Sequence, residues 1–191
     1  NISVKPTRIL RSAYLARYIS CVDIKIYRNL KYYEGFLGLL MKRPIAIDLF
    51  SGCGGMSLGL EAAGFDIAAA VEFDAIHTLV HHFNFPYSAS ICKEISKLSS
   101  QKLLEAIEEK GFSREIDLIA GGPPCQGFSH IGKRQLDDPR NSLVFEYLRI
   151  IKEIKPKYFI FENVPGIASG KHKKFLDELI IEFESIGYSI D

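Results

Sequence analysis

The sequence predicts an α/β protein built on a parallel sheet. From Pro44 onward, short apolar runs alternate with amphipathic helical patterns, which is typical of β-α-β units joined by right-handed crossovers. The chain has 191 residues, of which 47% are hydrophobic and 25% are charged, so it can form one domain with a sizeable core. The unusual clusters each follow a predicted strand, and ligands of such sheets bind beyond the carboxyl ends of the strands.

The first half contains two strands and three helices by its apolar periodicity. In chain order, the expected elements are strand 45–49, helix 56–63, strand 67–71, helix 74–83 and helix 98–110. The first strand stops at the glycine-rich stretch 51–55, and Gly64 follows the first helix as a C-cap. The second strand ends at Glu72.

The second half repeats the alternation. In chain order, the expected elements are strand 116–120, helix 142–154, strand 158–161, helix 175–183 and the opening of a strand at 188–191. The strand at 116–120 runs into Gly121–Cys125, and the strand at 158–161 runs into Glu162 and Asn163. Four clusters (52–55, Glu72, 123–125 and 162–165) are therefore expected to meet at one edge of the sheet.

The net charge of +1 conceals an asymmetry between two segments. Residues 1–43 form a basic leader with nine Lys and Arg against two Asp and Glu, whereas 44–191 carry a net charge of −6. The leader could touch nucleic acid or a membrane surface. Because Met41 directly precedes the first strand, we favour the interpretation that the leader lies upstream of the true start.

Several functional classes are disfavoured. The N-terminus lacks a secretory signal, and no apolar run is long enough to cross a bilayer, so a protein of the cytoplasm is expected. The four cysteines are all more than thirty residues apart, which disfavours a zinc site or a disulfide framework. His77 and His81 lie four residues apart on one predicted helix; we interpret them as a solvated helix face and expect no metal.

The glycine-rich loop would let the backbone approach a nucleotide-like ligand closely. It departs from the G-x-G-x-x-G fingerprint because Ser57 occupies the last glycine position. Glu72 is placed to accept hydrogen bonds from ribose hydroxyls, although an ordinary turn with a solvated carboxylate would also fit. A nicotinamide dehydrogenase fits the pattern of strands and glycines but explains neither Cys125 nor Glu162.

Cys125 and Glu162 admit a structural and a chemical interpretation. A lone cysteine is commonly a small buried hydrophobe, but Gly-Gly-Pro-Pro before Cys125 is hard to explain by packing alone. Glu162 could cap a turn with the help of Asn163, or it could act as a partly desolvated carboxyl that donates a proton to a substrate nitrogen.

The motifs resemble those of DNA cytosine-5 methyltransferases. Their order and spacing match in Asp48–Gly59 (DLFSGCGGMSLG), Gly121–Ser129 (GGPPCQGFS), Asp138–Leu143 (DPRNSL) and Glu162–Val164 (ENV). The resemblance covers residues 44–191 and implies a Rossmann-like, S-adenosylmethionine-dependent methyltransferase sheet, truncated before the target-recognition domain.

The resemblance implies a cofactor site for S-adenosyl-L-methionine, with Phe50 against the adenine and Glu72 on the ribose. The residues it assigns to this site are Asp48, Phe50, Ser51, Gly52, Cys53, Gly54, Gly55, Glu72, Phe73, Glu94, Pro123 and Leu143. Glu94 stands where the family usually has aspartate, one methylene shorter, which puts that contact in doubt.

The resemblance also implies the catalytic chemistry. The Cys125 thiolate would add to C6 of a flipped cytosine in double-stranded DNA, Glu162 would bond or protonate N3, and Asn163 would fix the loop. The residues expected at DNA are Gln126, Ser129, Lys133, Arg134 and Arg140. A bacterial restriction-modification enzyme, associated with the nucleoid when bound to DNA, is the implied setting.

The family's later motifs are not found in the sequence. These are an arginine-containing motif, the target-recognition domain and a final Asn-Gly-Asn-like motif. We therefore expect activity only in a longer chain or with a complementing C-terminal polypeptide. Two alternatives stay open: a non-catalytic cofactor-binding fragment, and an RNA cytosine-5 methyltransferase, which Gly127-Phe128-Ser129 disfavours.

Overall fold

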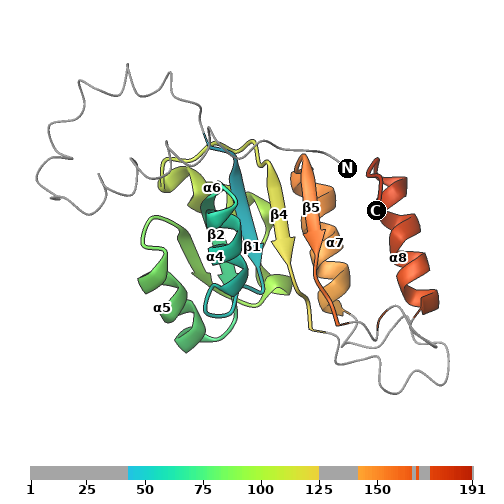
Figure 1. Cartoon of the computed structure of the whole chain (residues 1–191), viewed down its shortest axis with the longest axis horizontal. Coiled ribbons are helices and arrows are strands. Elements are labelled where there is room, and N and C mark those ends of the chain that lie inside the picture. The colour runs from blue at the N-terminus through green and yellow to red at the C-terminus, as the bar shows by residue number, and fades with distance from the viewer. Residues whose placement is uncertain (1–42, 125–141, 165–166, 168–172, 191) are drawn as a thin grey trace, which may run out of the picture. The chain divides into compact units, whose positions relative to one another are not determined.

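The computed structural model describes residues 43–124, 142–164, 167 and 173–190. Its centre is a five-stranded sheet in the order β3-β2-β1-β4-β5, and every neighbouring pair of strands is parallel (Figure 1). The strands are β1 (Ile45–Leu49), β2 (Asp66–Glu72), β3 (Ala89–Cys92), β4 (Leu118–Gly121) and β5 (Tyr158–Phe161). The parallel sheet expected from the alternating pattern is confirmed.

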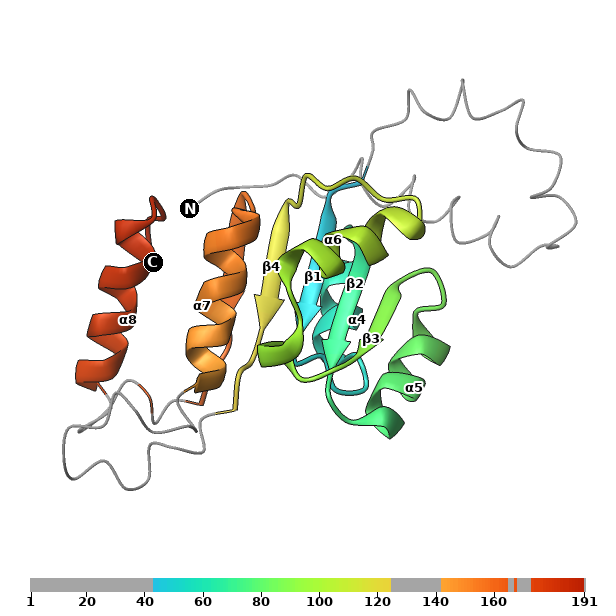
Figure 2. The ribbon, with the colours of Figure 1, turned by 180° about the vertical axis from the view of Figure 1, so that it is seen from behind.

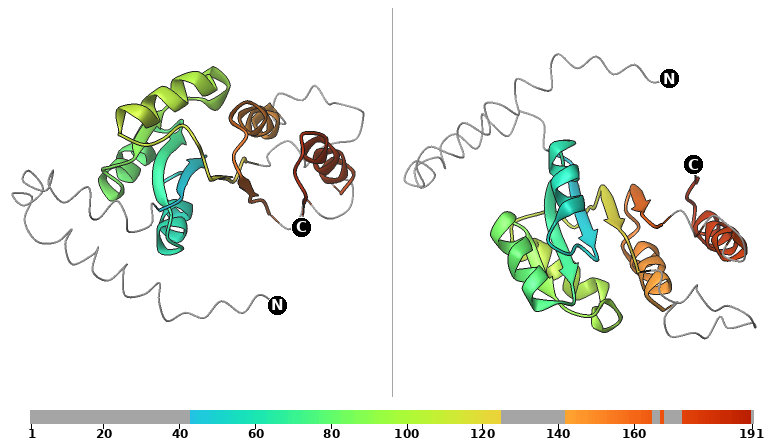
Figure 3. Two further views of the ribbon diagram at one scale, coloured as in Figure 1. Left: turned by 90° about the horizontal axis from the view of Figure 1, so that it is seen from above. Right: turned by 60° about the horizontal axis from the view of Figure 1, so that its bottom comes forward.

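Helices lie on both faces of this sheet. Helix α4 (Gly55–Ala62) covers one face, whereas α6 (Ser100–Glu109) and α7 (Ser142–Ile154) cover the opposite face (Figures 2 and 3). Helix α5 (Ala75–Asn84) contacts β2 and β3, and α8 (Lys173–Ser185) follows β5. A short 3-10 turn at Ile95–Lys97 precedes α6. Among the residues that the structure describes, no helix is long and apolar enough to span a membrane.

The larger core lies between the sheet and helices α6, α7 and α8. Ile47 and Leu49 of β1 are fully buried there with Leu103 of α6 and Ile151 of α7. Tyr147 of α7 is also fully buried, and its hydroxyl donates to the carbonyl of Ile160 at 2.9 Å. This bond gives the buried hydroxyl of Tyr147 a partner, as buried hydroxyls require.

A smaller core lies on the face that α4 covers. It joins Leu60 of α4 and Phe85 to Ala46, Leu118 and Ala120 of the sheet. Register extends this face to β5, because Leu118 pairs with Tyr158 and Ala120 pairs with Ile160.

The side chains of β5 on this face are open to solvent. Tyr158 is 69% exposed and Ile160 is 46% exposed. The sheet is therefore covered on this face over β1 and left open over β5, as far as the described residues go.

Two features of the sheet differ from the sequence prediction. The apolar pattern does not predict strand β3, because Ala-Ser-Ile-Cys is only four residues long and a serine interrupts it. The strand expected at 188–191 is wrong over 188–190, which form no strand. Tyr188 instead packs against Phe159, and its hydroxyl donates to the carbonyl of Pro156 at 2.6 Å. This segment is therefore held by side-chain contacts rather than by backbone hydrogen bonds to the sheet.

Helix α5 is amphipathic in the reverse of the usual sense. Its buried residues are Thr78 and His81, whereas the exposed fractions of Ile76, Leu79 and Phe83 are 73%, 68% and 85%. The interpretation of His77 and His81 as one solvated face is therefore wrong for His81, which is fully buried. Hydrophobicity alone selects the wrong face, because the buried positions are polar ones with polar partners.

Two leucine truncations test this arrangement. Leu103→Ala in α6 empties a fully buried position and should lower the free energy of unfolding by about 2–5 kcal/mol. Leu79→Ala in α5 removes an exposed side chain and should change it by less than about 0.5 kcal/mol. Urea denaturation measures both, and equal losses would contradict the burial of one and the exposure of the other.

Candidate cofactor and catalytic site

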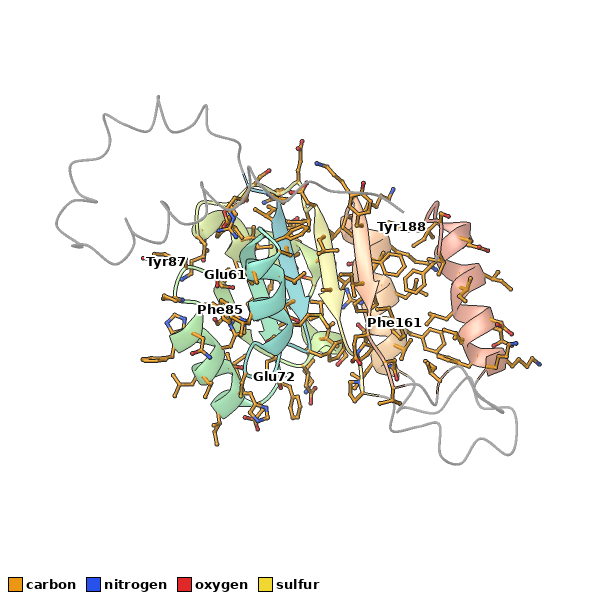
Figure 4. All side chains as sticks on the ribbon, viewed as in Figure 1. Glu61, Glu72, Phe85, Tyr87, Phe161 and Tyr188 are labelled. Atoms are coloured by element: carbon orange, nitrogen blue, oxygen red, sulfur yellow. The ribbon has the colours of Figure 1, made fainter. Side chains whose placement is uncertain are left out.

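The carboxyl ends of the parallel strands bring the described clusters to one edge of the sheet. Register aligns Val71 with Leu49, Leu49 with Gly121, and Gly121 with Phe161. The glycine-rich loop, Glu72, Pro123 and Glu162 therefore leave the sheet on the same side, as predicted from their positions. Figure 4 shows Glu72 and Phe161 toward this end of the sheet.

The loop between β1 and α4 has an unusual backbone. Phe50 has a positive φ of 61°, which is rare for a residue with a large side chain, and Gly52 and Gly54 have φ of 53° and 100°. The amide of Ser51 donates to the carbonyl of Val71 at 3.2 Å, and that of Gly54 donates to the carbonyl of Ser51 at 2.9 Å. These bonds hold the loop in a tight turn against the end of β2.

Glu72 holds the loop from the neighbouring strand. One carboxylate oxygen accepts the amide of Gly52 at 3.0 Å, and the other accepts the amide of Asp74 at 2.9 Å. The side chain is 7% exposed. Each oxygen keeps a further lone pair that can accept a hydrogen bond from a ligand hydroxyl. The solvated-carboxylate alternative does not describe this residue.

Asp48 supplies the cap that α4 lacks. The N-cap residue is Gly54, which has no side chain to bond the first turn. One Asp48 oxygen instead accepts both the amide of Ser57 at 3.0 Å and its hydroxyl at 2.6 Å. The pKa of Asp48 is raised to about 6, chiefly by burial and to a smaller extent by the charge of Glu72, against the lowering effect of these hydrogen bonds.

Ser57 explains why the glycine fingerprint is broken at this position. It lies in the first turn of α4 and is fully buried, and its hydroxyl lies 2.9 Å from Nε2 of His81. A glycine at position 57 could make neither side-chain contact. Sequence reasoning missed this role because the partners come from residues 9 and 24 positions away.

One polar atom of the loop is left without a partner. The Ser51 hydroxyl is buried, in a side chain 7% exposed, and bonds to no described atom. An unpaired buried hydroxyl costs free energy unless a ligand supplies the partner. Phe73, at the exit of β2, is 72% exposed. A buried hydroxyl, free carboxylate lone pairs and an exposed ring fit a ligand that carries both polar and aromatic groups.

Glu162 and Asn163 contact the segment that leads to Cys125. A side chain on Gly122 would lie 2.7 Å from Oε2 of Glu162, and Nδ2 of Asn163 donates to the carbonyl of Pro123 at 3.1 Å. The sequence suggests a partly desolvated Glu162 carboxyl. In the structure, this side chain is exposed to solvent. Side chains of β5 alternate between the two faces of the sheet, and Tyr158 and Ile160 are themselves exposed, so the apolar run before Glu162 does not bury its carboxyl.

The remaining predicted residues fall into two groups. Leu143 is half-buried against the larger core, Cys53 is exposed, and Glu94 forms an exposed ion pair with Lys97 at 2.5 Å. The residues that lie outside the described ranges are Cys125, Gln126, Ser129, Lys133, Arg134 and Arg140.

The fold and the loop together define a Rossmann-like α/β domain of the kind that binds nucleotide cofactors at the strand ends. A family model described as "C-5 cytosine-specific DNA methylase" matches residues 45–191. The chain belongs to this family, and its sheet is that of S-adenosylmethionine-dependent methyltransferases.

Individual relatives agree with the family model. The chain is 54% identical over 150 residues to the type II methyltransferase M.XorII of Xanthomonas oryzae pv. oryzae, an alignment that covers 78% of this chain and 35% of the relative. It is 44% identical over 137 residues to M.AquIA of Picosynechococcus sp., covering 71% of this chain and 54% of the relative.

A solved structure of a DNA modification methyltransferase encoded within an E. coli prophage superposes with a TM-score of 0.62. It is 38% identical, and the alignment covers 74% of this chain and 38% of that one. The chain thus spans between about a third and about half of the length of these relatives.

Asp48 should make stability fall as the pH rises. Its pKa is about 6 when folded and about 3.9 when unfolded, so the folded chain binds more protons between these values. We expect the free energy of unfolding, relative to Asp48→Asn, to fall by about 2–3 kcal/mol from pH 4 to pH 6.5. Urea titrations of the wild type and Asp48→Asn at several pH values measure this difference in the free energy of unfolding. A difference that stays constant or rises with pH would contradict a buried, cap-forming carboxylate.

Two glycines of the same segment provide a matched test of the loop. Gly54→Ala would place Cβ 2.6 Å from the Phe85 ring at a φ of 100° and should cost more than about 1 kcal/mol. Gly59→Ala lies within α4 with no atom within 4 Å and should stabilise the chain by about 0.5–1 kcal/mol. Thermal unfolding of both variants checks this, and a stabilised Gly54→Ala would contradict the loop geometry.

Proposed function

We propose that this chain is the cofactor-binding and catalytic portion of a DNA cytosine-5 methyltransferase. The observation that carries the proposal is the convergence, at one edge of the sheet, of the Glu72-clamped loop with the Glu162 and Asn163 contacts to Gly122–Pro123. Cys125 follows two residues later in the sequence. One edge therefore combines a nucleotide-binding loop with a candidate acid, and the candidate nucleophile is close to both in the sequence.

S-adenosylmethionine would supply an activated methyl group at this site. The Glu72 carboxylate, already oriented by the amides of Gly52 and Asp74, would accept hydrogen bonds from the ribose hydroxyls. Phe50 and the exposed ring of Phe73 would contact the adenine, and the unpaired hydroxyl of Ser51 would bond a polar group of the cofactor. Pro123 and Leu143 would complete the methionine side of the site.

The chemistry on cytosine is assigned to Cys125, Glu162 and Asn163. The Cys125 thiolate would form a bond to C6, and Glu162 would hydrogen-bond or protonate N3, which stabilises the charge pushed into the ring. C5 would then accept the methyl group, and loss of its proton would return the electron pair that expels Cys125. Asn163 would fix the Gly122–Pro123 backbone through its bond to the Pro123 carbonyl.

DNA contacts are assigned to Gln126, Ser129, Lys133, Arg134 and Arg140, which follow Cys125 in the sequence. The body from 44 to 191 has a net charge of −6, which opposes DNA binding by this body alone. We therefore assign most of the DNA affinity, and target selection, to a C-terminal portion. The setting is the bacterial cytoplasm, on the nucleoid while DNA is bound.

A complementing C-terminal portion also fits the open side of the sheet. Tyr158 and Ile160 of β5 are exposed on the face that α4 covers over β1, and the relatives are about two to three times as long as their aligned parts. A longer chain or a second polypeptide would bury these two side chains. If none exists, the alternative is a cofactor-binding fragment without catalytic activity.

Cofactor binding tests the first part of the proposal. Glu72→Ala should weaken S-adenosylmethionine binding by at least about tenfold, because it removes the ribose acceptor and the loop clamp. Glu115→Ala, an exposed residue before β4 at the opposite end of the sheet, is the matched control. Isothermal titration measures both, and equal affinities would contradict the assigned site.

Covalent trapping tests the second part. The chain, combined with the polypeptide encoded directly downstream, should form a covalent complex with DNA that contains 5-fluorocytosine, and Cys125→Ser should abolish it. Continued trapping by Cys125→Ser would contradict the assigned nucleophile. Methylation by the 191-residue chain alone would contradict the need for a C-terminal portion.

A further inference from the structure

A buried chain of polar groups runs beneath the cofactor loop. Nε2 of His81 lies 2.9 Å from the Ser57 hydroxyl, which lies 2.6 Å from an Asp48 oxygen, and Nδ1 of His81 lies 3.4 Å from the Ser90 hydroxyl. His81 and Ser57 are fully buried, and Asp48 is 1% exposed. The members come from β1, α4, α5 and β3, so four elements meet in one network.

Hydrogen-bond counting fixes where the protons lie. The Ser57 amide also bonds the Asp48 oxygen, so above its pKa of about 6 the carboxylate acts as acceptor and the Ser57 hydroxyl donates to it. The hydroxyl has one proton, so it must accept from His81. Burial lowers the pKa of His81, with a smaller contribution from His82. The ring is then neutral, with its proton on Nε2 and a bare Nδ1 facing Ser90.

The ring of His81 also packs directly beneath the loop. It lies 4.7 Å from the Phe85 ring, centroid to centroid. A side chain on Gly54 would lie 3.1 Å from a carbon of His81 and 2.6 Å from one of Phe85. The two rings therefore form the floor on which Gly54 takes its left-handed conformation.

We propose that His81 is a positioning residue for the cofactor loop, which it holds by donating a hydrogen bond from Nε2 to Ser57. Asp48 lies two residues before Phe50, and Ser57 lies three residues after Gly54, so the network fixes both ends of the loop that presents Ser51 and Gly52. The inference rests on the proposed function, because it concerns affinity for S-adenosylmethionine.

Two substitutions separate the contributions of the ring and its proton. His81→Phe keeps a ring against Phe85 and Gly54 but cannot donate to Ser57. His81→Gln loses the ring but places an amide donor near the position of Nε2. Ser100→Ala is the control for lost stability, because it removes a buried hydroxyl that bonds Glu153 at 2.5 Å, between α6 and α7. His82→Gln controls for an exposed histidine of the same helix.

The expected result is a pattern of dissociation constants for S-adenosylmethionine, measured by isothermal titration on the full chain. His81→Phe should raise the dissociation constant by about tenfold or more. His81→Gln, which keeps a donor to Ser57, should have a dissociation constant within about threefold of the wild-type value. Ser100→Ala and His82→Gln should leave it unchanged, even where Ser100→Ala lowers the melting temperature. The nitrogen NMR signals of His81 should show a neutral ring protonated at Nε2 without any cofactor.

Several outcomes would overturn the inference. One is a dissociation constant of His81→Phe equal to that of the wild type, and another is equally weakened binding in His81→Phe and His81→Gln. A third is weaker binding by Ser100→Ala in proportion to its lost stability. The last is an NMR signal that places the His81 proton on Nδ1. If the wild-type chain does not bind S-adenosylmethionine, the proposed function fails and this inference fails with it. The NMR measurement distinguishes the cases, because it reports the network in the absence of cofactor.

Discussion

The hydrogen bonds from Ser57 to the buried Asp48 carboxylate are the contacts on which the site depends. They join the end of β1 to the first turn of α4, and the loop between them then has fixed ends. The N-cap Gly54 has no side chain to cap α4, so Asp48 takes that role by accepting the amide of Ser57, and a carboxylate near a helix N-terminus is favoured by the helix dipole. Burial opposes the charge, as the raised pKa of Asp48 records.

The loop is held by contacts from β2 and from α5. On one side, Glu72 and the carbonyl of Val71 bond the amides of Gly52 and Ser51. Beneath it, His81 and Phe85 limit position 54 to glycine. The groups that stay available are the Ser51 hydroxyl, the second lone pairs of Glu72 and the ring of Phe73. A rigid backbone that presents a few unpaired groups lowers the entropy cost of ligand binding.

Two surfaces of the described chain are apolar and open. One is the α5 face with Ile76, Leu79 and Phe83, and the other is the β5 face with Tyr158 and Ile160. The second face continues a core that α4 already covers over β1, so the complementing C-terminal portion proposed above would have an apolar surface to pack on. The chain spans between about a third and about half of the length of its relatives.

The alternating fold and most element boundaries can be predicted from the sequence, because hydrophobic periodicity is a local property. The meeting of the glycine loop, Glu72 and Glu162 at one edge can also be predicted, because it follows from the order of parallel strands along the chain. The roles of Ser57 and His81 and the solvent exposure of Glu162 become visible only in the folded structure. These depend on contacts across 9 to 40 residues. In α5 the polar residues Thr78 and His81 face inward because their hydrogen-bond partners lie there. The hydrophobic periodicity of the sequence does not show where those partners lie.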